Sequence, residues 1–439
     1  MGISSTINGY KKKLSGPNRE LFIHSAFALV IRVFAAISSF VMNLVVTRHL
    51  GISNSGGFFL CFAVITVLAT LVRMGGDNLL IKNVSIFGSE QKWKTVKLIV
   101  IQVSKRAAVF SIIVTVLLLV FNNQIAKDVF QKGYISGTLF WMNLSMPLLA
   151  LYTLIAFAFQ GLNKVLYSVF IQNIIVPIFF SLLVIIFKCH SSVDAAKLYF
   201  GASLLTVILT ICLWYRIAPR GEPDEKAGLP ENLWKSSYIF WSLASVQMAI
   251  QWGGQFISGI FCKENDLAQL AIAQRTSMLI SFVLVAVNLV SAPKFASMYK
   301  QGEKEKLRRY AINSTRLMVL FATPIVLFIM VFPKFIMSFF GTGFTGGASM
   351  LFVLALGQYV NVLTGSVSYL LIMSGHERDT RNTQFLIGVF SIILSLILVK
   401  YYGAFGAAVA IAVSVAAQNL IYVGMAKRRL GFNTMAIWT

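Results

Sequence analysis

The sequence is poor in charge, cysteine and histidine. Only 12% of its 439 residues are charged, about half the share usual in soluble domains, which argues against a water-soluble fold. Four cysteines and four histidines are present. Their spacing fits neither a disulfide framework nor a Cys- or His-based metal site. We therefore expect no metal and no cofactor.

Acidic residues and enzyme motifs are also scarce. Asp and Glu number 15 against 38 Lys and Arg, a formal net charge of +23, which would suit nucleic acid, an anionic membrane surface or an anionic substrate. The basic residues are spread over short segments without a folded basic face, so nucleic acid is excluded. No G-x-S-x-G, H-E-x-x-H, Walker-type or G-x-G-x-x-G motif occurs, and we predict that the protein is not an enzyme.

Long apolar runs dominate what is present. The chain is 57% hydrophobic with a mean hydropathy of +0.77, and a bilayer core of about 30 Å needs about 20 apolar residues per helix. The sequence therefore predicts an all-α polytopic membrane protein with twelve transmembrane helices in two six-helix bundles around a central cavity. The expected spans are residues 21–46, 57–82, 98–121, 138–160, 165–187, 198–215, 237–260, 267–291, 317–340, 347–373, 383–401 and 403–425.

The basic residues are distributed unevenly between the two sides of this arrangement. If the N-terminus is inside, cytoplasmic segments hold 28 of the 38 and the opposite side holds 8. The positive-inside rule then predicts that both termini are cytoplasmic. A polar segment with Pro and mixed charge follows the sixth span, so we expect an N-terminal bundle at 1–215, a cytoplasmic linker at 216–236 and a C-terminal bundle at 237–439.

Three arginines stand out within the predicted spans. An ionisable side chain at the centre of a membrane costs about 2.5–3.5 kcal/mol on insertion scales, so it usually faces a cavity or a partner. We expect Arg32 and Arg275 to face a substrate cavity. Arg73 precedes Asp77 by four residues, and this pair is either a helix-end salt bridge or gate, or part of the substrate site.

Amide side chains mark a second cavity-lining pattern. Gln247, Gln251 and Gln255 recur every four residues and so share one helix face, which must meet protein or water because lipid cannot satisfy amides. The alternative is ordinary helix–helix hydrogen bonding. The remaining polar candidates for the cavity are Gln274, beside Arg275, and the isolated residues His24, Asn43, Gln358 and Asn361.

All acidic residues fall outside the centres of the predicted spans. A cation exporter, or a carrier that binds H⁺ or Na⁺ at a buried carboxylate, would need an acid at that depth. Guanidinium groups bind phosphate in a bidentate manner, and amides hydrogen-bond to sugar hydroxyls. The pattern therefore favours an anionic, hydroxyl-rich substrate.

Several stretches of the sequence resemble a known family. These are residues 48–83, beginning RHLGISNSGGFF, residues 291–307, SAPKFASMYKQGEKEKL, residues 354–382, beginning LALGQYVNVLTG, and residues 401–414, YYGAFGAAVAIAVS. In this order they resemble the polysaccharide-transporter branch of the MOP (multidrug/oligosaccharidyl-lipid/polysaccharide) superfamily, in particular the Wzx-type O-antigen repeat-unit flippases.

This resemblance implies a flippase that moves undecaprenyl-diphosphate-linked oligosaccharide across the bacterial inner membrane, with helices 1, 2, 7 and 8 lining the cavity. The implied partners are this lipid-linked substrate, the bilayer, and the polysaccharide polymerase and chain-length proteins. The alternative function is a secondary multidrug or cation exporter of the MATE type. The absence of an acidic residue at mid-membrane depth argues against this alternative. The fourteen spans usual in lipid II flippases argue against that branch.

Overall fold

The computed structural model describes residues 17–218, 228–230 and 233–436, apart from the side chains of residues 17–30, 235–236, 239, 286, 289–290 and 293. All regular structure in this part is helical. The side chain of His24 and most of the predicted linker lie outside the described residues.

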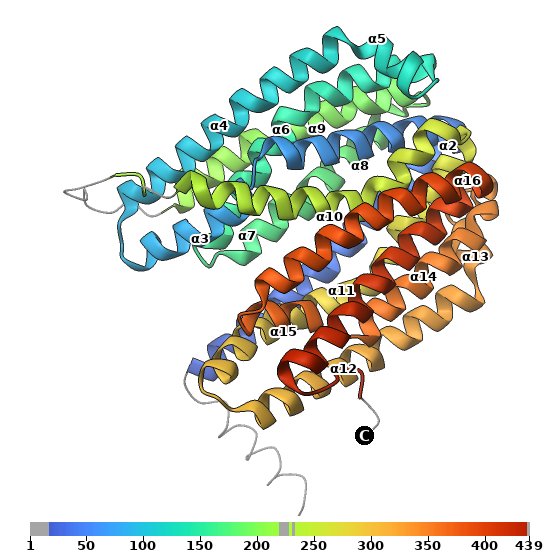
Figure 1. The fold of residues 1–439 in the computed structure, drawn as a ribbon. Coiled ribbons are helices and arrows are strands. Elements are labelled where there is room, and N and C mark those ends of the chain that lie inside the picture. Colours follow the sequence, from blue (N-terminus) through green and yellow to red (C-terminus); the bar gives the residue numbers. More distant parts are fainter. Residues whose placement is uncertain (1–16, 219–227, 231–232, 437–439) are drawn as a thin grey trace, which may run out of the picture.

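The first half of the chain forms an N-terminal bundle, drawn in blue to green in Figure 1. Its elements are α2 (Pro17–Val72), α3 (Gly76–Ser89), α4 (Trp93–Val120), α5 (Asn122–Gln124), η1 (Ile125–Val129), η2 (Gly133–Ile135), α6 (Ser136–Gly161), α7 (Val165–Phe170), η3 (Ile171–Ile175), α8 (Val176–Phe187) and α9 (Ser192–Ile217).

The second half forms a C-terminal bundle, drawn in yellow to red. Its elements are α10 (Leu233–Phe261), α11 (Glu264–Lys300), α12 (Lys304–Val331), α13 (Pro333–Ser338), η4 (Thr342–Gly347), α14 (Ala348–Leu363), α15 (Val367–Met373) and α16 (Glu377–Leu430). The two bundles meet along α2 and α11, and in Figure 1 they diverge from the right side of the view toward the left.

Nine helical stretches of the described chain are long and apolar enough to cross a membrane. Two of them contain a sharp bend at a glycine: Gly51 in α2 (φ 69°, ψ −179°) and Gly403 in α16 (φ 56°, ψ −142°). Only glycine adopts such backbone angles without a steric penalty. The chain is therefore a multi-pass membrane protein in which each of these long helices changes direction at a glycine.

Three predicted spans are interrupted or displaced in the structure. The expected helix 347–373 is divided into α14 and α15 by the turn at Thr364–Ser366, where Gly365 has a positive φ of 69°. The expected helix 57–82 is interrupted because α2 ends at Val72, and Met74 and Gly75 take positive φ before α3 begins. The expected helix 317–340 is also wrong in its limits. It begins earlier, at Lys304, and ends at Val331, because Pro333 cannot continue the preceding helix and starts α13 instead.

The two bundles touch in more than one place, and we call the contact around Arg48 and Lys132 the closed end. There the Arg48 Nε of α2 donates a hydrogen bond to the Phe339 carbonyl oxygen at 2.6 Å. The Lys132 Nζ donates to the Gly259 carbonyl oxygen of α10 at 2.9 Å. Both acceptors lie at helix C-terminal ends, where a cation is stabilised by unpaired carbonyl groups. Cations of the N-terminal bundle thus cap two helices of the C-terminal bundle.

Candidate functional site

The first of two polar pockets lies mainly between helices of the N-terminal bundle, and we call it the arginine pocket. Its volume is about 380 Å³. Arg275 of α11 and Arg73 of α2 both line it, and its described lining contains no carboxylate. The other polar or aromatic lining residues include Asn43, Phe62, Thr66, Thr70, Tyr152, Thr153, Gln172, Asn173, Tyr199 and Trp252.

Arg275 is held in this pocket mainly by aromatic rings. Its Cζ lies 4.6 Å from the ring centroids of both Phe59 and Phe62 and 5.9 Å from that of Trp252. Its Nη1 donates a long hydrogen bond of 3.4 Å to Asn43 Oδ1, while the buried Nε and Nη2 have no partner. Cation–π contacts offset part of the desolvation cost of the guanidinium. Two buried N–H groups remain available for an anionic ligand.

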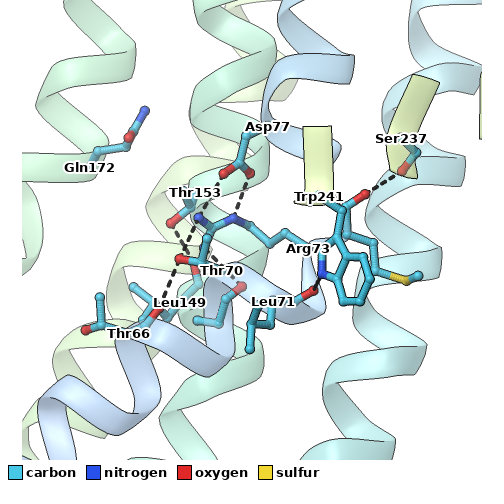
Figure 2. Close-up of polar contacts among 12 residues, drawn as sticks. Thr66, Thr70, Leu71, Arg73, Asp77, Leu149, Thr153, Gln172, Ser237 and Trp241 are labelled. Atoms are coloured by element: carbon cyan, nitrogen blue, oxygen red, sulfur yellow. Dashed lines mark hydrogen bonds and ion pairs between the residues drawn. The ribbon is translucent and has the colours of Figure 1, made fainter. Parts of the chain in front are cut away.

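Arg73 is fully engaged, in contrast (Figure 2). Its Nε and Nη2 donate to the two carboxylate oxygens of Asp77 at 2.7 and 2.9 Å. Its Nη1 donates to the Ala69 carbonyl oxygen and its Nη2 also to Thr70 Oγ1. This bidentate ion pair spans the break between α2 and α3. Of the two roles expected for the pair, the geometry favours the salt bridge that fixes the break.

The same break contacts α10 through its carbonyl groups. Trp241 Nε1 donates to the Leu71 carbonyl oxygen at 2.9 Å, and Ser237 Oγ donates to the Met74 carbonyl oxygen (Figure 2). The end of α10 that lies away from the closed end is thus attached to the N-terminal bundle. The Arg73–Asp77 pair shapes the turn to which α10 is attached.

The second pocket lies within the C-terminal bundle, and we call it the amide pocket. Its volume is about 660 Å³, and α10, α11, α14, α15 and α16 line it. Met278 of α11 lines both this pocket and the arginine pocket. Amide side chains are its most numerous polar groups: Gln247, Gln251, Gln274, Gln358, Asn361, Gln384, Gln418 and Asn419.

The structure divides the predicted site residues between these pockets. The amide pocket contains Gln247, Gln251, Gln274, Gln358 and Asn361. The arginine pocket contains Arg275, Arg73 and Asn43, and Asp77 is placed there only through its ion pair with Arg73.

Besides Asp77, two predicted residues are not among the described lining of either pocket. Gln255 is the residue of the glutamine stripe that lies nearest the closed end. It is 1% exposed, and its Nε2 donates to the Phe59 carbonyl oxygen at 3.4 Å. Arg32 lies on α2 with its Nε buried and unpartnered.

Several lining residues were not predicted from the sequence. Gln172 and Asn173 line the arginine pocket, and Gln418 and Asn419 line the amide pocket. Each pair stands as two adjacent amides within an apolar run, and this pattern is a usable signal because lipid cannot satisfy two neighbouring amides. The aromatic residues around Arg275 carry no such signal, since aromatic residues occur throughout the chain.

Comparison with known proteins gives family and fold matches. The family described as polysaccharide biosynthesis protein matches residues 24–299, and the MatE family matches residues 244–399. No curated protein sequence matches the chain.

Solved structures with the same fold include three transporters. The lipid II flippase MurJ in an inward closed conformation has a TM-score of 0.71 and 13% identity over 93% of this chain and 87% of that one. An inward-facing multidrug resistance MATE transporter has a TM-score of 0.66 and 15% identity over 92% and 98%. A MOP superfamily transporter from Pyrococcus furiosus has a TM-score of 0.61 and 13% identity over 95% and 97%.

These likenesses show that the chain has the all-helical fold of these MATE and MurJ structures, as expected. The first family match spans 276 of the 439 residues, which is more than half of the chain. The chain therefore belongs to the polysaccharide biosynthesis protein family.

Proposed function

We propose that the protein is a flippase that translocates undecaprenyl-diphosphate-linked oligosaccharide repeat units across the bacterial inner membrane, for the synthesis of surface polysaccharide such as O-antigen. The observation that carries the proposal is Arg275. A buried cation with two free N–H groups and no carboxylate in the described lining of its pocket is suited to a diphosphate. The family match and the likeness to MurJ support a lipid-linked substrate.

The membrane arrangement that we propose has twelve spans. The nine stretches count α2 and α16 once each, although each bends at a glycine and is long enough for two spans. Helix α10, with 29 residues, adds one more. An even number agrees with cytoplasmic termini and with the excess of basic residues at the helix ends opposite the closed end.

Alternating access is the proposed mechanism. In this orientation the closed end faces the periplasm, and the contact of α10 with the turn at Leu71–Met74 lies toward the cytoplasm. The linker around residues 216–236 joins the two bundles. The bundles would rock about this linker and so open the closed end. Binding shifts such an equilibrium only by its different affinity for the two states, so the diphosphate must contact Arg275 more closely in one of them.

Replacement of Arg275 tests this function. Arg275→Ala removes at least one charge-assisted hydrogen bond of about 1.5–3 kcal/mol, so transport should fall at least about 10- to 150-fold. Arg275→Lys should restore part of it, because charge returns without the planar fork. We expect a similar loss for Arg32→Ala. The readout is surface polysaccharide in a flippase-deficient strain, together with the amount of protein in the membrane.

The matched control is Arg309→Ala. Arg309 is 76% exposed on α12 and pairs with Glu305, so its loss should leave the polysaccharide unchanged. Wild-type polymer from both Arg275→Ala and Arg32→Ala, at normal protein levels, would refute the arginine site.

A secondary multidrug or cation exporter of the MATE type is the second candidate, favoured by the MatE match over residues 244–399. Expression in a pump-deficient strain with a panel of cationic dyes separates the two functions. The flippase proposal expects no gain in dye resistance.

A further inference from the structure

The amide pocket differs from the arginine pocket in the placement of its charges. Its charged lining residues are Glu377, Arg378 and Arg381, all in the first two turns of α16 and all exposed. The rest of the described wall is neutral, with apolar side chains between amides and hydroxyls that come from four other helical segments as well as α16. A neutral wall behind a charged mouth suits the uncharged part of a ligand.

One buried group in this wall lacks a partner. Gln274 is 2% exposed, and its Nε2 donates to the Gln251 carbonyl oxygen at 2.6 Å, whereas its Oε1 is buried without any hydrogen bond. A buried acceptor left unpaired is costly. Amides offer both donors and acceptors, and a sugar hydroxyl is both as well. The unpaired Gln274 Oε1 therefore indicates that a hydroxyl group of a ligand donates a hydrogen bond to it in the occupied site.

The two pockets are adjacent and differ in chemistry. Met278 lines both, so the two pockets share this side chain as part of their walls. The volume of about 660 Å³ lies within the range of about 300–1,000 Å³ of small-molecule sites. An anionic group joined directly to a hydroxyl-rich group fits this arrangement.

We propose that the amide pocket is the glycan subsite and determines which repeat unit is carried, while the arginine pocket binds the diphosphate common to all such substrates. This inference rests on the proposed function and adds to it a division of the substrate between the two bundles. Gln251 of α10 and Gln358 of α14 are specificity-determining residues. Met278 separates the two subsites.

The test measures two dissociation constants for the purified full-length protein in nanodiscs. The first probe is undecaprenyl diphosphate without sugar. The second is the undecaprenyl-diphosphate-linked repeat unit extracted from a flippase-deficient strain that the wild type complements. The variant Gln251→Met/Gln358→Met keeps side-chain volume and the Gln251 carbonyl group that Gln274 uses.

The double variant should raise the dissociation constant of the linked repeat unit about 10-fold, the loss of about two neutral hydrogen bonds. Its affinity for undecaprenyl diphosphate should stay within about twofold of the wild type, because the arginine pocket is intact. This retained binding also shows that the variant is folded. Arg275→Ala should weaken both probes, and the control Gln124→Leu/Gln301→Leu, which removes two exposed amides, should weaken neither.

Equal weakening of both probes by the glutamine variant, or no weakening of either, would overturn the glycan subsite alone. A wild-type protein that binds neither probe would overturn the proposed function, and with it this inference. Selective weakening of the linked repeat unit supports both.

Discussion

The two bundles approach each other closely at Gly56 of α2, and a single methyl group there should open the closed end. A Cβ atom built on Gly56 would lie 2.8 Å from the Glu264 carbonyl carbon of α11 and closer still to its oxygen. Ser53, one turn before Gly56, also hydrogen-bonds to the Glu264 carboxylate at 3.1 Å. The obstacle is backbone, which a rotamer change cannot move. Gly56→Ala therefore requires the two helices to separate.

The size of the effect follows from this geometry. Carbon atoms pack at about 3.5 Å or more, so α2 and α11 must move apart by at least about 0.7 Å. Inserting a methyl group into a packed contact costs about 1–3 kcal/mol. Because this cost falls only on the state in which the bundles touch, the open population should rise about 5- to 150-fold.

Cys262, two residues before Glu264, is a native reporter of this opening. Its thiol is 7% exposed, and burial raises its pKa above the ordinary value. Opening hydrates the thiol and increases the thiolate fraction, which is the reactive form. With Cys61, Cys189 and Cys212 replaced by serine, labelling of Cys262 by a membrane-impermeant maleimide should accelerate in proportion to the open population.

The control is Gly424→Ala, because a Cβ atom at Gly424 would meet nothing within 4 Å. In this variant the maleimide should label Cys262 at the wild-type rate. If Gly56→Ala also labels at that rate while remaining folded, the Gly56–Glu264 contact does not hold the closed end, and this reasoning fails.

Two further predictions concern ion pairs and caps. Asp77→Ala leaves Arg73, only 9% exposed, without its counter-ion, so the free energy of unfolding in detergent should fall by about 3 kcal/mol. Arg73→Met/Asp77→Met should recover most of this, and an equal loss in both variants would contradict a buried pair. Burial lowers the pKa of Lys132, so the closed state binds fewer protons than an open state with a solvated amine. Closure should therefore strengthen as pH rises from that lowered pKa toward the ordinary value of 10.5. Spin labels at His190 and Asn265 should move closer at alkaline pH in the wild type but not in Lys132→Met, and a lengthening distance would refute the sign.

Hydropathy located the membrane-crossing segments well because the bilayer demands about 20 apolar residues wherever a helix crosses it. It missed the break at Arg73–Gly75, since a short turn inside an apolar run hardly changes a window average. The start of α12 at Lys304 was missed for a related reason. The part of a helix that extends beyond the bilayer need not be apolar, and its amphipathic pattern resembles a polar loop.

The sequence singled out candidate site residues only where the residue type is costly to place in lipid. Candidate residues of types that are common in membrane helices were not recognised. Arg275 stood out as a lone charge, but Phe59 and Phe62 are two of 36 phenylalanines and have no distinguishing pattern. The glutamine stripe shows the limit of periodicity. Helical spacing places Gln247, Gln251 and Gln255 on one face, but it cannot show that α2 covers the last of them at the closed end.

The site and the closed end share their two central helices, and this connects binding to gating. Helix α11 carries Arg275 and, eleven residues earlier, Glu264, which lie about 16 Å apart along the helix axis. Helix α2 carries Asn43, Phe59 and Phe62 beside Arg275, and also Gly56 beside Glu264. An anion that pulls Arg275 away from the aromatic rings would tilt α11 against α2, and the contact at Gly56 allows almost no sliding. Occupancy of the arginine pocket and separation at Gly56 are thus two consequences of one relative motion of α2 and α11.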